Sequence, residues 1–565
     1  MGRKMRSVMK YGLFLFLMFF CVAKGKTQLV ISTEMAKNLV EKTALLTDRE
    51  IYCVDEKIHF SAVNLSSSEL KRVEWSNVLY VELMAPDGQV VTRRKYSYSK
   101  DGSTGSLMIP TGTLSGNYYL RAYTKWMRDY SPLNFYYKLV TVINPYRAEL
   151  LEASGLKQTV QFTSGLIGYD SLSAKIETDK RSYSQKERAS VIIKSEKAFA
   201  DEYAVSVVPE GTEKKTSFNL VGAKDLKFSQ DFIPETRGLS VSGKVVNDVD
   251  SLPMPYTLVG LTVFKGKPET RNLRTNEHGQ FYFDLSKVEG DFEIFISAKA
   301  TEDRMPLILV DNDYSAAKVD LPYIPFNMSV ASMRVYQQMA FVSQMKKYYM
   351  QQNVREEMKS SLVDTSFYGK PDFTVKLPDY IALPSVSEYF YELISSVRVK
   401  HEGTKRTFRV LGPYSELAVY EPLVLVDMVP IFDADKVLSL SPEKIERIEV
   451  VTSPYVRGDI VFGGIVSLFS KKGDLAGIDL PTTGRFINYS MLSPGKTDTD
   501  SSVSGEHVPS LNNCLYWNSS VKPDQTGEAK ISFSTGDNTG NFLIIVSGFD
   551  SNGKEKVAIK KIVVN

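Results

Sequence analysis

Residues 47–62 of this 565-residue chain are TDREIYCVDEKIHFSA, and residues 178–193 are TDKRSYSQKERASVII. In both stretches a Thr-Asp pair precedes a tyrosine, five positions after the threonine, and a glutamate four positions later. Alternating apolar residues follow, which is the pattern of a strand with one buried face. The repeat therefore predicts a strand, a corner anchored by the tyrosine, and a second strand. Chance matching of common residues is the alternative, but the shared alternation downstream favours two related β-sandwiches.

Length and composition extend this prediction to a mainly β, multidomain fold. A chain of 565 residues is too long for one hydrophobic core, so several domains of ordinary size are expected. The hydrophobic share of 43% and the charged share of 24% are typical of a folded globular protein. The 31 Tyr and 29 Phe against three Trp favour strands, because Tyr and Phe suit a half-buried pleated surface.

The first 25 residues have the pattern of a signal peptide. A basic start precedes an apolar run over residues 11–23 that is too short to span a bilayer comfortably, and Ala23 and Gly25 supply the small residues that cleavage requires. Lipid attachment at Cys21 is the alternative, which the bulky Phe20 before it disfavours. We expect an exported protein, in the periplasm or associated with the outer membrane, with no transmembrane span after cleavage.

Charge excludes some partners. Residues 1–25 hold five basic residues and no acid, so cleavage would change the formal net charge from +3 to −2. A nearly neutral mature chain does not imply nucleic acid or anionic lipid as a partner.

The rest of the chain divides by composition and turn signals into β-sandwich modules, a helical connector and one small α/β domain. After the signal peptide at 1–25, we expect a lead segment at 26–45, β-sandwiches at 46–147, 148–237 and 238–316, a helical connector at 317–376, the α/β domain at 377–476, a linker at 477–509 and a C-terminal β unit at 510–565. The last unit is short for a complete sandwich, and packing on another module would complete it. Its Gly540-Asn541 repeats Gly116-Asn117 of the first unit.

Two helices are expected between residues 330 and 400. Residues 333–358 lack Gly and Pro and are rich in helix formers, with Met339, Val342, Met345 and Tyr349 as a packing stripe. A second helix is expected over residues 385–397, where Ser385 and Glu388 have the spacing of a capping box.

No catalytic, cofactor-binding or metal-binding residue is predicted, and we expect neither an enzyme nor a cofactor. The histidines lie in four different predicted units, without the spacing of a zinc site: His59, His278, His401 and His507. The sequence contains no Gly-x-Ser-x-Gly elbow, no glycine-rich phosphate loop and no CxxC. Residues 550–553 have the start of a calcium loop without its distal glutamate, so a turn is favoured there. Cys53 and Cys514 are either paired, which export permits, or two buried free thiols, which their distance in the sequence favours.

The repeated stretch resembles a known family. The motifs are Thr47-Asp48-Arg49-x-x-Tyr52, Glu56-x-Ile58-x-Phe60 and Gly116-Asn117-Tyr118-x-Leu120-Arg121-Ala122. Residues 47–145 resemble the macroglobulin-like (MG2-type) sandwiches of the alpha-2-macroglobulin superfamily, in the form seen in large exported proteins of Bacteroidetes-type bacteria. Residues 178–208, which hold the second copy of the repeat, share this resemblance. Protease traps of that superfamily capture covalently through a Cys-Gly-Glu-Gln thioester. Neither Cys53 nor Cys514 begins that sequence, so covalent trapping is not expected.

Two further segments resemble modules of outer-membrane proteins. Residues 383–473 resemble the plug domain of TonB-dependent receptors, and the motifs are PLVLVD at 422–427, SPEKIERIEV at 441–450, GGIVS at 463–467 and KKG at 471–473. Met428 stands where the family usually has glycine, which leaves the conformation of that turn open. Residues 238–313 resemble a carboxypeptidase-regulatory-like sandwich, through SGKV at 242–245 and Asn276-x-x-Gly279-x-Phe281-x-Phe283. Residues 474–565 are too few to form a receptor barrel, so the resemblance implies a shared module and not receptor function.

The leading hypothesis is a non-catalytic cell-envelope binding or scaffold protein at the periplasmic face of the outer membrane. Its expected partners are other envelope proteins, including an outer-membrane barrel protein. The plug resemblance implies an alternative, an accessory component of TonB-dependent nutrient uptake that docks on a separate barrel protein. The macroglobulin resemblance implies another, a thioester-free protease-binding protein.

Overall fold

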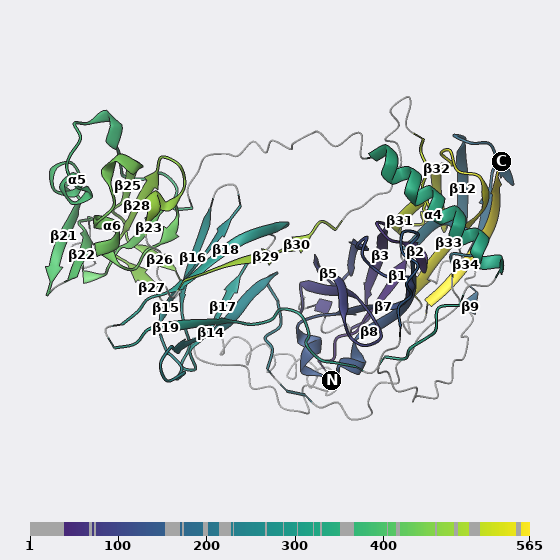
Figure 1. Ribbon diagram of the computed structural model, residues 1–565, viewed down its shortest axis with the longest axis horizontal. Coiled ribbons are helices and arrows are strands. Elements are labelled where there is room, and N and C mark those ends of the chain that lie inside the picture. Colours follow the sequence, from purple (N-terminus) through teal and green to yellow (C-terminus); the bar gives the residue numbers. More distant parts are fainter. Residues whose placement is uncertain are drawn as a thin grey trace, which may run out of the picture.

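The computed structural model describes residues 39–565 except 67–70, 73–74, 153–169, 172–173, 196–201, 214–227, 230, 266–267, 286–287, 302, 320, 328–329, 351–366, 404, 414–418, 458–459, 479–483, 496–508 and 550–554. The predicted signal peptide, Cys21 and most of the predicted lead segment lie outside these residues. The fold is mainly β and multidomain, as predicted, with many small sheets and few helices. Figure 1 shows the α/β domain at one end of the long axis and the C-terminal strands at the other.

The first sandwich has two sheets packed around one core. The smaller sheet contains, in spatial order, β1 (Thr43–Thr47), β3 (Lys57–Asn64) and β6 (Ser103–Met108). The larger contains β2 (Ile51–Cys53), β8 (Tyr136–Ile143), β7 (Gly116–Tyr123), β4 (Val78–Met84), β5 (Val90–Ser97) and β30 (Leu492–Ser493). Apolar side chains from both sheets meet in the core, among them Phe60 and Leu120. Strand β30 comes from far along the chain and pairs in parallel with β5.

The second sandwich is built from two separate parts of the sequence. One sheet contains β10 (Ala174–Thr178), β12 (Arg188–Ser195) and β32 (Glu528–Ser534). The other contains β11 (Ser182–Tyr183), β34 (Glu555–Val564), β33 (Gly540–Phe549), β13 (Tyr203–Pro209) and β31 (Tyr516–Val521), and β9 (Asp170–Ser171) also pairs with β34. The C-terminal strands, which the sequence analysis placed in a unit of their own, are thus hydrogen-bonded to strands of the second sandwich.

The two sandwiches share one strand order. With β9 and β30 left out of the count, strands one, three and six along the chain form the small sheet of each, and strands two, eight, seven, four and five form the other. The register agrees as well, because Thr47 pairs with Phe60 and Thr178 pairs with Val191. In the second sandwich the chain between its fourth and fifth strands, β13 and β31, holds the third sandwich, a long helix and the α/β domain. The first sandwich has only a short turn between β4 and β5 at this position.

The third sandwich also takes a strand from far along the chain. Its sheets contain β17 (Gln280–Asp284), β14 (Ser240–Asn247) and β19 (Pro306–Val310), and β16 (Glu269–Arg274), β15 (Leu258–Phe264), β18 (Asp291–Ala298) and β29 (Arg485–Ser490). The prediction of a linker over 477–509 is therefore wrong for residues 485–493, which form β29 and β30. Strand β29 extends the third sandwich and β30 extends the first, so one short segment joins the two.

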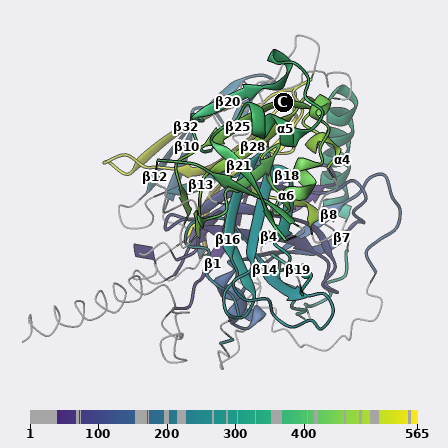
Figure 2. The same ribbon diagram turned by 90° about the vertical axis from the view of Figure 1, so that its left-hand side faces the viewer.

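The α/β domain lies beyond the third sandwich and faces the viewer in Figure 2. Its five-stranded sheet contains β20 (Phe373–Lys376), β25 (Ile445–Val451), β28 (Ile465–Ser470), β23 (Leu423–Val426) and β24 (Val429–Pro430). Around it are the hairpins β21 (Val397–Glu402) with β22 (Lys405–Val410) and β26 (Tyr455–Arg457) with β27 (Ile460–Phe462), and the helices α5 (Val386–Glu392) and α6 (Ala434–Leu438). Helix α5 begins after Ser385, whose hydroxyl accepts from the Glu388 amide, as the capping box predicts. It ends at Glu392, earlier than predicted, because residue 397 already begins β21.

Helix α4 (Val330–Met350) lies across the junction of the first two sandwiches (Figure 1). Met339 packs against Ile51 and Cys53 of the first sandwich, as a packing stripe requires. The Gln338 amide donates to the Thr539 carbonyl of the second sandwich over 2.6 Å. Within the described residues no helix combines the length and apolar character needed to cross a membrane. Short 3-10 segments lie at Trp126–Asp129, Pro132–Asn134, Leu377–Asp379, Pro442–Lys444 and Leu475–Gly477.

Candidate functional site

The corner of the first repeat is a buried polar cluster. The Tyr52 hydroxyl donates to Asp48 Oδ1 over 2.8 Å and lies 2.5 Å from the Arg49 carbonyl. Asp48 Oδ1 also accepts from the His59 amide over 3.1 Å, so one carboxylate joins the corner to β3. The Arg49 guanidinium pairs with Asp48 Oδ2 at 2.5 Å and with Glu56 Oε2 at 2.6 Å. The tyrosine therefore anchors the corner, as the repeat predicts.

The electrostatics of this cluster follow from its burial. Burial raises the pKa of Tyr52 well above its ordinary value, and the neighbouring Asp48 carboxylate acts in the same direction. Burial disfavours the charged form of Arg49, but the carboxylates of Glu56 and Asp48 outweigh that effect and hold its pKa above its usual range. Burial also lowers the pKa of His59. The cluster is thus a buried structural element in which one guanidinium pairs with two carboxylates.

The second repeat has the same corner with different surroundings. Tyr183 donates to Asp179 over 2.7 Å, and Asp179 accepts from the Ser190 amide over 3.0 Å. Lys180 and Glu187 form the ion pair that corresponds to Arg49 and Glu56. Asp179 and Lys180 are nevertheless exposed, whereas their counterparts in the first corner are buried. The same local structure therefore has two roles, one inside an interface and one on the surface.

Residues from the second sandwich and from α4 cover the first corner. The Asn513 side chain donates to Glu56 Oε1 over 2.7 Å and to the Met339 carbonyl over 3.0 Å. Cys514 is buried next to it, and the Trp517 ring lies 6.5 Å from the His59 ring. The repeated corner of the first sandwich is thus the contact point of three parts of the chain.

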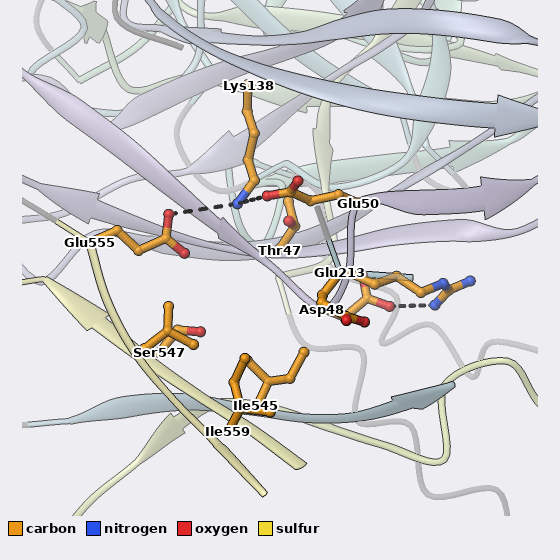
Figure 3. A pocket seen from close by; sticks show the side chains of 11 residues that line it. Thr47, Asp48, Glu50, Lys138, Glu213, Ile545, Ser547, Glu555 and Ile559 are labelled. Atoms are coloured by element: carbon orange, nitrogen blue, oxygen red, sulfur yellow. Dashed lines mark hydrogen bonds and ion pairs between the residues drawn. The ribbon is translucent and has the colours of Figure 1, made fainter. Parts of the chain in front are cut away.

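A small hollow lies beside this contact, between the first and second sandwiches (Figure 3). Lys138 of β8 extends into it, with its ammonium 3.4 Å from Glu50 Oε1 and 3.8 Å from Glu555 Oε2 of β34. The hollow is lined by Thr47, Asp48, Arg49, Glu50, Lys138, Glu213, Ile545, Ser547, Glu555, Val557 and Ile559. These lining residues include no histidine or cysteine that would act as a base or nucleophile. Their arrangement connects the two sandwiches through one shared ammonium.

Buried ion pairs join the first sandwich to the third. Lys95 of β5 lies 2.5 Å from Asp313 Oδ2, donates to the Ser490 carbonyl over 2.9 Å, and lies 3.9 Å from the centre of the Tyr489 ring. All three partners come from segments outside the first sandwich. Since a buried ammonium is costly without such partners, Lys95 fixes their positions relative to β5.

A second pair lies on the neighbouring strands of the same face. Arg121 of β7 pairs with Glu82 of β4 at 2.5 Å, and its guanidinium donates to the Ser315 carbonyl over 3.2 Å. The Tyr80 hydroxyl donates to Glu235 over 2.9 Å, and Glu235 accepts from the Ser240 amide over 3.0 Å. Burial raises the pKa of Glu235. The segments around residues 235 and 315 are therefore held on the first sandwich by specific polar contacts and not by apolar packing alone.

The turn at Met428 is the joint between the α/β domain and the third sandwich. Asp427 and Met428 both have left-handed backbone conformations, with φ of 46° and 68°, in the two-residue turn between β23 and β24. The Met428 carbonyl accepts hydrogen bonds from the hydroxyls of Thr262 and Thr270 on the third sandwich. Gly260 allows this contact, because a Cβ there would lie 2.8 Å from Cγ of Pro430. A methionine thus occupies a conformation that favours glycine.

The structure places the histidines and cysteines apart from any common site. His59 is at the sandwich junction, whereas His278 and His401 are exposed in the third sandwich and the α/β domain, and His507 lies outside the described residues. No three described His, Cys, Asp or Glu side chains are grouped so that they would hold a metal ion. Cys53 and Cys514 are both buried and unpaired, the arrangement that the sequence favours. The calcium-like turn at 550–553 also lies outside the described residues.

Comparisons with known proteins assign no family. No family model and no curated protein matches the sequence. Among solved structures, methylamine-reacted alpha-2-macroglobulin from Salmonella is 8% identical and covers 93% of this chain and 39% of its own, with a TM-score of 0.23. Native alpha-2-macroglobulin from Escherichia coli is 8% identical over 93% of this chain and 40% of its own, with a TM-score of 0.23. Dimeric latent PorU from Porphyromonas gingivalis is 10% identical over 48% of this chain and 33% of its own, with a TM-score of 0.15.

The chain spans about two fifths of the length of these macroglobulins. At TM-scores this low, the likeness carries no argument about what this chain does.

Proposed function

We propose that this chain is a non-catalytic binding or scaffold protein of the cell envelope, located at the periplasmic face of the outer membrane. The observation that carries the proposal is the buried pair of Lys95 and Asp313, which joins the first sandwich to segments of the third. Removing one partner of a buried ion pair is strongly destabilising, so an interface that contains such a pair is a fixed one. The modules thus form a rigid frame, which suits a protein that holds binding surfaces at set positions.

The frame also fixes the α/β domain. Its Met428 turn is hydrogen-bonded to two threonines of the third sandwich, and Lys299 of that sandwich pairs with Glu421 at 2.6 Å. The α/β domain and the second sandwich lie at opposite ends of the molecule (Figure 1). A partner bound at one end would therefore be held at a fixed distance from a partner bound at the other.

A second candidate is an accessory role in TonB-dependent nutrient uptake, through docking on a separate barrel protein. It is supported by the placement of the three segments that resemble a receptor plug. Residues 423–426, 445–451 and 465–470 form β23, β25 and β28, which are adjacent in one sheet with β28 in the middle. The segments that carry the resemblance thus belong to one structural unit.

Photo-crosslinking of the full-length protein in intact envelopes tests the leading proposal. A photoreactive residue would replace Ile381, which is 89% exposed on the α/β domain, with Lys530 on the exposed sheet of the second sandwich as the comparison position. We expect the Ile381 probe to capture a defined envelope protein, and cell fractionation to place the complex with the outer membrane. Repeated failure to capture a partner from either position, or a cytoplasmic location, would count against the proposal.

Two measurements separate the alternatives. Loss of nutrient uptake on deletion supports the accessory role, and unchanged growth across carbon and metal sources contradicts it. The protease-binding alternative requires that the purified protein alter the activity of a protease on large substrates.

A further inference from the structure

Two adjacent turns form one exposed end of the third sandwich. The first, residues 248–252, follows β14, and the second, residues 303–305, precedes β19. The Asp248 amide donates to the Met305 carbonyl over 2.9 Å, and the Asn247 amide donates to the Leu252 carbonyl over 2.8 Å. These bonds place the two turns side by side. We call residues 248–252 and 303–305 the tip.

Large apolar side chains of the tip face the solvent. Val249 is 88% exposed, Leu252 is 55% exposed and Met305 is 47% exposed. Single exposed apolar residues are common, but these three lie on two turns that hydrogen bonds hold side by side, and clustered exposed apolar side chains are typical of interaction sites. We call these three side chains the patch. Ser251 between them has a left-handed backbone with φ of 57°, which costs a non-glycine residue about 1 kcal/mol or more. The loop thus keeps a strained conformation that leaves its apolar side chains uncovered.

The charged side chains of the tip are mostly negative. Asp248, Asp250 and Asp303 are all exposed, and Arg304 is the cation that the tip contributes. Asp250 also accepts a hydrogen bond of 3.0 Å from the Leu252 amide, which holds its carboxylate at the turn. Positions 248–252 and 303–305 therefore combine three apolar side chains with a formal net charge of −2.

This charge decides between possible occupants. An anionic membrane surface would repel the aspartates, so insertion of the tip into such a surface is disfavoured. A second copy that docked tip to tip would place aspartates against aspartates, which costs binding energy. A protein segment that carries both apolar and basic side chains would cover the patch and neutralise the carboxylates.

We propose that the tip docks a basic amphipathic segment of a partner protein. The inference rests on the proposed binding function and names one surface that would serve it. The third sandwich, which carries the tip, lies between the α/β domain and the first sandwich (Figure 1). A partner bound at the tip would therefore be held by the same frame.

Peptide binding to the full-length protein tests this proposal. The probe is a fluorescent peptide of alternating lysine and leucine, and the comparison peptide has glutamate in place of lysine. We expect the basic peptide to bind, and the acidic peptide to bind more weakly by about tenfold or more. Combined Val249→Ser, Leu252→Ser and Met305→Ser substitution should weaken binding of the basic peptide by about tenfold or more. Combined Asp248→Lys and Asp303→Lys substitution should reverse the preference between the two peptides.

Leu309→Ser is the matched control. Leu309 is a 45% exposed apolar residue of β19 that lies outside the tip, and its substitution should leave peptide binding unchanged. Because all the substituted side chains are exposed, thermal unfolding should be unaltered in every variant, and this confirms that each is folded. Equal binding by the triple serine variant, or equal binding of both peptides to the unmodified protein, would overturn the proposal.

Two further measurements identify a wrong choice of occupant. Sedimentation with vesicles of phosphatidylglycerol and phosphatidylcholine in equal parts, if lost in the triple serine variant, would assign the tip to a membrane. Self-association in analytical ultracentrifugation, if lost in the same variant, would assign it to a second copy. If the tip fails all these tests while the Ile381 probe still captures an envelope partner, this inference falls and the proposed function stands.

Discussion

The hydroxyl of Tyr52 donates a 2.8 Å hydrogen bond to the buried carboxylate of Asp48, and the hydroxyl of the equally buried Tyr183 donates a 2.7 Å hydrogen bond to the exposed carboxylate of Asp179. Because the two hydrogen bonds join the same groups and differ in the exposure of the aspartate, their comparison measures the effect of burial within one protein. The difference arises because the second sandwich and α4 cover only the first corner.

We predict that Tyr52→Phe destabilises the protein more than Tyr183→Phe. The first change leaves the buried Asp48 carboxylate and the Arg49 carbonyl without this donor, which costs about 1–3 kcal/mol. After the second change, water can replace the lost donor at the exposed Asp179, so the cost should stay below about 1 kcal/mol. Urea unfolding of the two variants measures the difference. Equal losses would show that the burial of the corner does not affect its strength.

The repeat in the sequence predicts these two corners because they depend on local contacts. Tyr, Asp and Glu at fixed spacing make the same bonds in both copies, and Asp55 and Lys186 have the same left-handed backbone. The division of the second sandwich into two parts depends instead on the pairing of residues 203–209 with 516–521, and no local pattern specifies a pairing so distant. The repeated Gly-Asn was the available signal. It marks the start of the seventh strand in both sandwiches, at Gly116 and Gly540.

The composition of residues 485–493 predicted a linker, and the structure has two strands there, for a related reason. A Gly-, Ser- and Thr-rich stretch predicts a linker, yet β29 needs a partner on one side only, which β18 supplies. Its Tyr489 is buried against Lys95.

The sequence analysis also did not predict the buried ion pairs of the frame. A single charged residue inside an apolar strand, such as Glu82 or Arg121, indicates such a pair. The sequence does not show which oppositely charged residue is its partner.

The second sandwich should fold only when both of its parts are present. Its core contains Val191 and Val205 from one part and Ile531 and Phe542 from the other. We expect residues 170–213 joined to 509–565 by a short Gly-Ser linker to show cooperative thermal unfolding by circular dichroism. Residues 148–237 alone would leave half of that core exposed and should be unfolded. Cooperative unfolding of the 148–237 fragment would contradict the discontinuous sandwich.

The pair of Lys95 and Asp313 should be strongly coupled. Lys95→Met leaves a buried carboxylate without its counter-charge, and we expect a loss of about 3–5 kcal/mol. Adding Asp313→Asn to that variant should restore part of the loss, because the uncompensated charge is gone. A double-mutant cycle by chemical denaturation measures the coupling. The control is Lys175→Met in the exposed pair with Glu177, where we expect at most about 1 kcal/mol.

Met428→Gly tests the joint of the α/β domain through two opposing effects. Glycine relieves a left-handed conformation that costs methionine about 1–2 kcal/mol. The substitution also removes a buried side chain from a core shared with Leu258 of the third sandwich, at about 2–5 kcal/mol. Packing should prevail, so we expect a net loss of about 1–3 kcal/mol in thermal unfolding. A more stable variant would mean that backbone strain, and not packing, dominates this turn.

Glu41 should make stability depend on pH near neutrality. Burial raises the pKa of Glu41 from its ordinary value of 4.5 to about 7, although hydrogen bonds from Thr124 and Ser76 act in the opposite direction. At a pH between these two pKa values, the Glu41 carboxyl of the folded chain keeps a proton that it has released in the unfolded chain. The contribution of Glu41 is therefore fully present below pH 4.5 and is lost as the pH rises toward about 7. Each unit of that interval is worth about 1.4 kcal/mol, so the total is on the order of 3 kcal/mol.

Glu41→Gln isolates this effect, because glutamine does not titrate and all other groups titrate alike in both proteins. We expect the stability of the variant relative to the unmodified protein to rise as the pH increases from 4.5 to about 7, and to level off above that. Urea unfolding of both proteins across this range measures the difference. A difference that stays constant with pH would mean that the Glu41 carboxyl has the same pKa in the folded and unfolded chain. Its burial beside Ser76 and Thr124 would then impose no cost on the charged form.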